Sequence, residues 1–192
     1  MASRARVVDA ARALFEEVGF HDTTVRMIAE RAGLSPGGVF TTFEDKVAIL
    51  CQIVGEQREA LFTAIEEAAP GMDGSARDRL LRVLEMAHAD EFPRLRMVAA
   101  YIGASYGWNS RLEEEHRTLH RRLVQVIGSI LRDGVEHGEI AAGTDVDLLI
   151  EILSSVYLRN YRTALHAGFD EASMNARVVR QVDLIFAGAS PR

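Results

Sequence analysis

Two residue classes are almost absent from this 192-residue chain. Of its 22 basic side chains only Lys46 is a lysine, and Cys51 is its one cysteine. A lone cysteine cannot form an internal disulfide, which suits a reducing compartment, so we interpret Cys51 as a small core-facing helix residue. The chain also lacks a secretory signal at its start and any run of roughly 18 apolar residues. These absences predict a cytoplasmic protein without a membrane-spanning helix.

An excess of positive charge is missing too. The formal net charge is −6, and residues 1–46 carry six basic side chains against seven acidic ones. Any nucleic-acid partner must therefore be recognised through the local placement of side chains rather than through bulk charge.

The sequence shows no catalytic pattern. It has no glycine-rich phosphate loop after a strand, no His-Glu-x-x-His motif and no nucleophile beside an evident base. We therefore predict that the protein is not an enzyme and uses no cofactor.

Strand patterns are scarce, whereas helical patterns recur along the chain. Apolar residues share one helical face over residues 7–18, and Gly19 ends that pattern. A shorter face covers residues 25–32, with Thr23 or Thr24 as its N-cap. Longer helices are expected over residues 45–69, 111–137, 145–167 and 170–187. Capping boxes are expected at Ser75 with Asp78, Ser110 with Glu113, and Thr144 with Asp147. The sequence predicts an all-α fold of about nine helices.

The stretch LSPGGVF contains residues that normally favour a loop, yet it can form a short helix. Ser35 is a good N-cap, and Pro36 suits the first turn because its missing N–H is not needed there. Gly37 and Gly38 each cost roughly 1 kcal/mol in a helix interior, and they remove side chains from the outer surface. A helix over residues 36–42 would complete a helix-turn-helix that enters the DNA major groove. It could equally be a helical hairpin that only packs inside a larger bundle.

The segment TTVRMIAERAGLSPGGVFTTFEDKVAIL, residues 23–50, resembles the DNA-binding signature of the TetR (tetracycline-repressor-like) regulators. The preceding AARALFEEVGF resembles that family's first helix. The resemblance implies a helix-turn-helix domain over residues 1–46 and a helical effector-binding and dimerisation domain over residues 47–192. It implies a homodimeric repressor that a small hydrophobic or aromatic effector releases from an approximately palindromic operator. The alternative is a helical small-molecule-binding protein or enzyme in which the helix-turn-helix is only structural.

The resemblance also assigns DNA contacts. Thr24 would cap the second helix and touch a phosphate, Arg26 would reach a base edge or a phosphate, and Lys46 would meet a phosphate. The residues expected to enter or border the groove are Ser35, Pro36, Gly37, Gly38, Phe40, Thr41 and Thr42. Phe40 replaces the family's usual tyrosine, and Thr42 replaces a histidine or tyrosine. Both differences shorten the reach toward the DNA backbone.

Residues 97–110, MVAAYIGASYGWNS, place large aromatic side chains among alanines and glycines. Such a mixture can leave an apolar cavity with a few hydroxyl groups, and it can equally be plain packing. The family keeps effector pockets in this region, so the resemblance favours a pocket. The expected lining residues are Phe62, Met86, Met97, Tyr101, Tyr106, Trp108, His116, His120 and Tyr157.

His116 and His120 are four residues apart, a spacing that metal-binding pairs use. Because spacing nominates no third ligand, we predict no metal site. His116 falls within the apolar face of its helix, as a hydrogen-bonded core histidine or as a polar contact in the pocket.

The last two expected helices each carry a broad apolar face. These faces can bury against their own domain or pair with a second copy in a four-helix bundle. The family dimerises through the corresponding helices, so the resemblance implies an interface. Its expected residues are Leu149, Leu153, Val156, Val178, Val182, Ile185 and Phe186.

Overall fold

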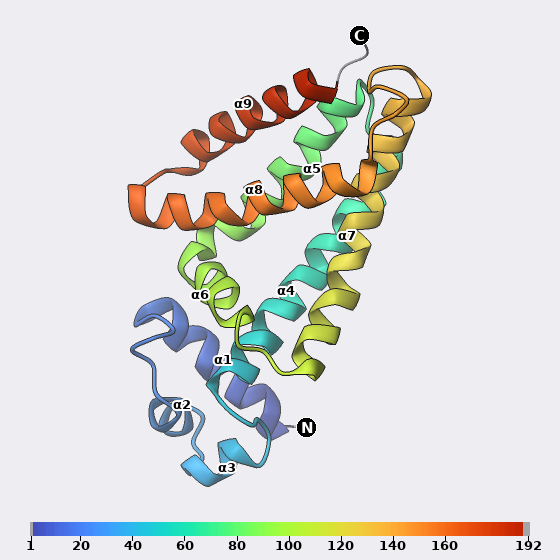
Figure 1. The fold of residues 1–192 in the computed structure, drawn as a ribbon. Helices are drawn as coiled ribbons and strands as arrows, with labels where there is room; N and C mark the ends of the chain where they lie inside the picture. The colour runs from blue at the N-terminus through green and yellow to red at the C-terminus, as the bar shows by residue number, and fades with distance from the viewer. Residues whose placement is uncertain (1, 190–192) are drawn as a thin grey trace. The chain divides into compact units, whose positions relative to one another are not determined.

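The structure, a computed structural model, describes residues 2–189, and Figure 1 shows their fold. This part of the chain is helical without a strand, as predicted. Its nine α-helices are α1 (Ala2–Glu17), α2 (Val25–Arg31), α3 (Pro36–Phe40), α4 (Lys46–Ala68), α5 (Ala76–Glu91), α6 (Leu95–Ser105), α7 (Ser110–Glu136), α8 (Val146–Ala167) and α9 (Glu171–Ala189). Two 3₁₀ turns, Ala69–Gly71 and Phe92–Arg94, precede α5 and α6. None of the described helices is long and apolar enough to cross a bilayer.

The chain divides into two compact units. Unit 1 comprises Met1–Glu59 and Arg94–Arg117, and unit 2 comprises Ala60–Pro93 and Thr118–Arg192. Helices α4 and α7 contribute residues to both units. Residues 94–117, which the sequence assigned to the effector domain, thus share a compact unit with the helix-turn-helix. The functional division at residue 46 stays a prediction.

Local capping bonds define the helices of unit 1. The Thr24 side chain accepts a hydrogen bond from the Met27 N–H at 3.2 Å and so begins α2. The Ser35 side chain accepts from the Gly38 N–H at 3.2 Å, with Pro36 in the first turn of α3. Each cap satisfies a backbone donor that has no partner within the helix. Between the two helices, Gly33 adopts φ +66°, a left-handed conformation that glycine reaches without strain.

The core of unit 1 joins the helix-turn-helix to α4 and α6. Helix α2 packs on α1 and α3, and α1 also contacts α6. Buried side chains fill the centre, among them Phe15, Ile28, Val39, Ile49 and Ile53. Burying an apolar side chain of this size contributes about 1.5–3 kcal/mol, so packing rather than helix propensity holds the five-residue α3.

Cys51 is half-buried in α4. Burial raises the pKa of its thiol to about 12, so the thiol stays protonated at neutral pH. The sequence-based view of Cys51 as a packing residue agrees with this position.

Unit 2 is built around α5, which lies against α9, while α9 also contacts α8 (Figure 1). The predicted capping box at Ser75 and Asp78 is present in both directions and begins α5. The buried core includes Leu80, Leu84, Leu131, Leu153 and Val182.

Two other predicted caps are displaced by one residue. Asn109 caps α7 by accepting from the Leu112 N–H, and Ser110 is the first helical residue. Asp145 caps α8 by accepting from the Leu148 N–H, in place of Thr144. In both places a second good cap residue adjoins the one the pattern selected.

Candidate functional site

Helix α3 presents an open outer surface. Val39 is 1% exposed and anchors the helix, whereas the ring of its neighbour Phe40 is turned outward and is 54% exposed. A Cβ atom at Gly37 would approach only the Ser35 Oγ, at 3.9 Å. Gly37 therefore leaves open space on the outer surface, as a helix that approaches another surface closely requires, whereas a Cβ at Gly38 would lie 3.6 Å from the Leu34 Cβ.

Few basic side chains near this surface are free to bind DNA. Arg31 forms two hydrogen bonds with Glu17, at 2.8 and 2.7 Å. Arg12 pairs with Glu56, and Arg4 donates to Gln52 and to the Thr42 carbonyl. Within the described part of the chain, Arg6 and Arg26 are the basic residues before residue 46 that make no such bond.

Lys46 begins α4, and its side chain makes contacts other than the phosphate contact that the sequence predicted. Its ammonium donates to the carbonyls of Phe20, His21 and Thr23, at 2.5, 3.2 and 2.6 Å. The nitrogen also lies 4.4 Å from the centre of the Phe20 ring. Burial lowers the pKa of Lys46, and the charge of Asp22 partly opposes that shift. Because all three N–H groups are occupied, Lys46 ties the α1–α2 turn to the start of α4, and the predicted phosphate contact is corrected.

Three of the predicted pocket residues do come together in unit 1. The Tyr101 hydroxyl and His116 Nδ1 are hydrogen-bonded at 2.8 Å, and the Trp108 ring lies 4.9 Å from Tyr101 and 5.0 Å from His116, centre to centre. The Arg58 guanidinium lies 5.0 Å from the Tyr101 ring centre. The rings thus fill the space between them, and His116 is hydrogen-bonded as a core histidine would be.

The remaining predicted pocket residues are dispersed. Met97 lies in the core of unit 1, whereas Phe62, Met86, His120 and Tyr157 belong to unit 2. Tyr106 is 92% exposed after the end of α6 and lines no cavity, so its assignment is corrected. The aromatic residues of the segment 97–110 did not by themselves predict which of them is buried. Tyr106 is exposed because it follows the last residue of α6, Ser105.

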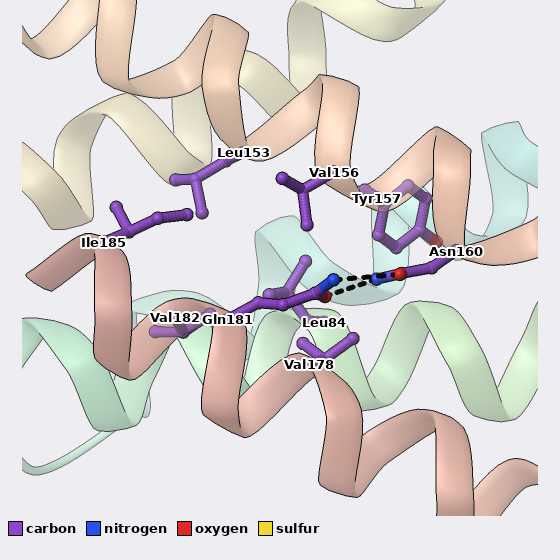
Figure 2. A pocket seen from close by; sticks show the side chains of 9 residues that line it. All are labelled: Leu84, Leu153, Val156, Tyr157, Asn160, Val178, Gln181, Val182 and Ile185. Atoms are coloured by element: carbon purple, nitrogen blue, oxygen red, sulfur yellow. Dashed lines mark hydrogen bonds between the residues drawn. The ribbon is translucent and has the colours of Figure 1, made fainter.

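A small apolar pocket does exist in unit 2, between α5, α8 and α9 (Figure 2). Its volume is about 10 Å³, room for roughly one water molecule. Figure 2 shows the amides of Asn160 and Gln181 joined by two hydrogen bonds across it, at 2.7 and 3.1 Å. The lining residues are Leu84, Leu153, Val156, Tyr157, Asn160, Val178, Gln181, Val182 and Ile185.

Beside this pocket lies a buried polar cluster, formed by His88, Glu91, Tyr157 and Tyr161. Both tyrosine hydroxyls donate to Glu91 Oε2, at 2.6 and 2.5 Å. The His88 ring stacks on the Tyr157 ring, 5.3 Å away, and its Nδ1 is hydrogen-bonded to the Asn175 Oδ1 at 2.7 Å.

Two features of the cluster are unusual in an apolar core. His88 Nε2 is buried without a hydrogen-bond partner in the described structure, and burial lowers the pKa of this histidine. Burial also raises the pKa of Tyr161 well above its usual value. Sequence analysis missed His88, Glu91 and Tyr161. The available signal was spacing, since residues 88 and 91 share a helix face, as do residues 157 and 161.

Helix α8 has apolar side chains on two faces, and the residues predicted for the dimer interface lie on the face that packs inside unit 2. Leu149 and Leu153 are 6% and 7% exposed and pack inside unit 2, as do Val178 and Val182 of α9. Ile185 and Phe186 are half-buried against the same core, and Val156 is half-buried beside the pocket. The exposed apolar side chains are Leu148, Ile152, Leu158 and Leu165 on α8 and Leu184 on α9.

Comparisons with known proteins agree with the helix-turn-helix geometry. The family model described as bacterial regulatory proteins, tetR family, matches residues 7–53. The HTH-type transcriptional regulator SrpR of Pseudomonas putida is 22% identical over 185 residues, which cover 93% of this chain and 80% of SrpR. The HTH-type transcriptional regulator BetI of Klebsiella pneumoniae (strain 342) is 36% identical over 128 residues, which cover 64% of this chain and 60% of BetI.

A solved structure shares the fold over nearly the whole chain. The transcriptional regulator FadR from Bacillus subtilis, in complex with stearoyl-CoA, superposes with a TM-score of 0.73 at 20% identity, over 93% of this chain and 96% of FadR. Taken with the capped α2–α3 unit, the family match shows that residues 7–53 form the DNA-binding region of the tetR family of bacterial regulatory proteins, and the chain is a DNA-binding transcriptional regulator.

Proposed function

We propose that this protein is a cytoplasmic repressor that binds an approximately palindromic operator as a homodimer and leaves it when an apolar effector binds in unit 2. The observation that carries the DNA-binding part is the outer surface of α3, where Phe40 and the open Gly37 face away from the core. The N-terminal residues of such a helix meet base edges in the major groove.

The homodimer follows from the outward face of α8. Leu148 and Ile152, four residues apart on one face, are 52% and 44% exposed, and Leu158, 42% exposed, lies on the same outward half of the helix. Large apolar side chains that gather on the exposed half of one helix support a protein–protein interface. The same surface on a second copy satisfies two-fold symmetry, in which each protomer uses identical residues.

The effector site follows from the unit 2 pocket. Its walls are apolar except for the amide pair Asn160–Gln181, and the buried polar cluster adjoins it through Tyr157. Such a setting suits a molecule with an apolar body and a polar end. FadR, which shares the fold, was solved with stearoyl-CoA, a compound of this type. Since the present volume holds only about one water, the effector must separate α8 from its neighbours.

That movement links the effector to the operator. Helix α8 carries pocket residues on its inner face and the proposed dimer residues on its outer face. The two states differ in the distance between α8 and its neighbours α5 and α9. An effector that binds the state with α8 separated more tightly than the closed state shifts the dimer toward the separated arrangement. A coupling of about 1–3 kcal/mol changes the operator affinity roughly 5- to 150-fold.

The test begins with an operator isolated by in vitro selection from random duplexes. Stearoyl-CoA and stearic acid are then titrated into the operator complex, and DNA release is followed by fluorescence anisotropy. We expect release by at least one of these probes. Val156→Trp, which fills the pocket, should retain DNA binding and lose the response, whereas Arg180→Trp, at an exposed position of α9 outside the pocket and the proposed dimer surface, should keep it. Equal responses from both variants would place the effector elsewhere.

A further inference from the structure

The outer surface of α3 offers almost no hydrogen-bonding side chain to a DNA groove. Pro36 and Gly37 are exposed and have no polar side-chain atom. The Thr41 hydroxyl donates to the Gly38 carbonyl at 2.7 Å, so its proton is used within the helix. The largest group on this surface is the Phe40 ring, 54% exposed.

Hydrogen-bond readout of bases in the major groove depends on side chains such as Arg, Lys, Asn and Gln. Helix α3, Pro36–Phe40, contains none of them. Arg26, on α2, is exposed and free among the described residues, but it provides only one such group. Besides the hydroxyls of Ser35, Thr41 and Thr42, the side-chain surface that the recognition helix offers a base is apolar.

The thymine C5 methyl is the one apolar group that a base pair presents in the major groove. A phenyl ring that projects from this short helix can reach a base edge, because Gly37 leaves open space on the outer surface of the helix. The ring has no hydroxyl with which to bind a phosphate. Building on the proposed DNA binding, we infer that Phe40 determines operator specificity by packing against thymine methyl groups.

The exposure of Phe40 supports a functional contact rather than a structural one. A buried Phe40 would stabilise the core, but the anchoring role on α3 belongs to Val39 and, beyond the helix, to Phe43, which is 4% exposed. Because the Phe40 ring is exposed, it contributes little to the free energy of folding. Packing the ring against a methyl group removes apolar surface from water, which favours binding.

The experiment removes the methyl groups singly. Each thymine of the selected operator is replaced by deoxyuridine, which keeps every base-pairing group and lacks only the C5 methyl. For the unmodified protein we expect about a fourfold loss of affinity at one or two positions in each half-site, since one buried methyl is worth about that factor. At cytosines of weaker sites, 5-methylcytosine should raise the affinity by a similar factor where it places a methyl beside the ring.

Phe40→Ala is the decisive variant. It should bind thymine and deoxyuridine operators equally at those positions, and its selected operators should lose their thymine preference there. Tyr106→Ala removes another exposed aromatic ring of unit 1 and should leave the deoxyuridine effect unchanged. Because the Phe40 side chain is exposed, the Phe40→Ala protein should have the same melting temperature as the unmodified protein.

Two outcomes overturn the inference. If Phe40→Ala keeps the full deoxyuridine effect, another residue reads the methyl groups. If no thymine position responds in the unmodified protein, Phe40 does not read thymine at all. Both differ from failure of the proposed function, in which selection yields no preferred operator.

Discussion

The two compact units place their exposed apolar side chains differently. In unit 1 the exposed rings of Phe40 and Tyr106 are isolated residues at the end of a short helix and in a turn. In unit 2 the exposed leucines and isoleucine lie on α8, apart from Leu184 on α9. An isolated ring suits a contact with one base, whereas a row of apolar residues suits a protein surface.

Their interiors differ as well. The buried polar side chains of unit 1 are Thr23, which donates to the carbonyls of Gly19 and Leu14, and Arg58, which lies over the Tyr101 ring. Unit 2 buries His88, Glu91 and Asn160, and leaves His88 Nε2 without a partner, while in unit 1 the Trp108 Nε1 is the buried atom without one among the described residues that contact Tyr101. Unpaired buried polar atoms cost about 1–3 kcal/mol. The proposed effector site adjoins the unpaired atom of unit 2, which lies within a larger group of buried polar side chains.

The largest expected effect contrasts the two faces of α8. Leu153→Glu puts a charge into the core of unit 2, where no partner was built for it, and should prevent stable folding. Ile152→Glu changes the adjacent outward residue and should give a folded monomer with weakened operator binding. Circular dichroism melting and sedimentation velocity separate these results. A dimeric Ile152→Glu protein would remove this face from the interface.

The second effect tests how closely unit 2 is packed. At Gly134 an added Cβ would lie 2.7 Å from the Ala76 Cβ and 3.0 Å from the Ile140 Cδ1. At Gly128, on the same helix, it would approach only the mobile end of the Arg132 side chain, at 3.1 Å. Gly134→Ala should lower the stability by about 1–3 kcal/mol through overpacking. Gly128→Ala should be neutral or gain up to about 1 kcal/mol of helix propensity. Equal melting temperatures would show that α5 and α7 adjust freely.

The third effect separates structural from DNA-binding cations in unit 1. Lys46→Met loses three bonds to carbonyls and should lower the stability by about 1–2 kcal/mol, with little change in the salt dependence of DNA binding. Arg26→Met should leave the melting temperature nearly unchanged and flatten the log–log salt slope by about 0.9. A flattened slope in the Lys46 variant would restore the phosphate contact that the sequence predicted.

Local signals explain why the sequence located the helix-turn-helix so closely. Thr24, Ser35 and Gly33 act on backbone groups within a few residues, so their roles can be recognised without knowing the tertiary structure. The errors at Ser110 and Thr144 have the same origin, because Asn109 and Asp145 are equally good local caps.

Longer-range features escaped prediction because packing decides them. Leu149 and Leu148 are neighbours of the same chemical type, and only the placement of α8 against α5 and α9 buries one and exposes the other. Likewise, Lys46 meets the carbonyls of residues 20–23 through the packing of helices, which no sequence spacing reveals.

The smallest expected effect tests the buried polar cluster through pH. Burial lowers the pKa of His88 below its unfolded value of about 6.5, although the Asn175 bond and the Glu91 charge oppose the shift. As the pH falls through that value, the unfolded chain binds a proton that the folded protein does not. The stability contributed by neutral His88 is therefore present above about pH 6.5 and declines below it, by at most about 1.4 kcal/mol per pH unit.

The side chain in the His88→Gln protein cannot titrate, so the melting temperature of this variant should fall less between pH 7.5 and 5.5 than that of the unmodified protein. This window lies above the carboxylate pKa values that ion pairs and capping bonds lower, such as those of Glu66 and Asp78, so carboxylate titration adds little to the difference. Parallel melting curves for the two proteins would mean that His88 is protonated as readily in the folded state as in the unfolded one, and the cluster would then lose its distinction from an ordinary surface histidine.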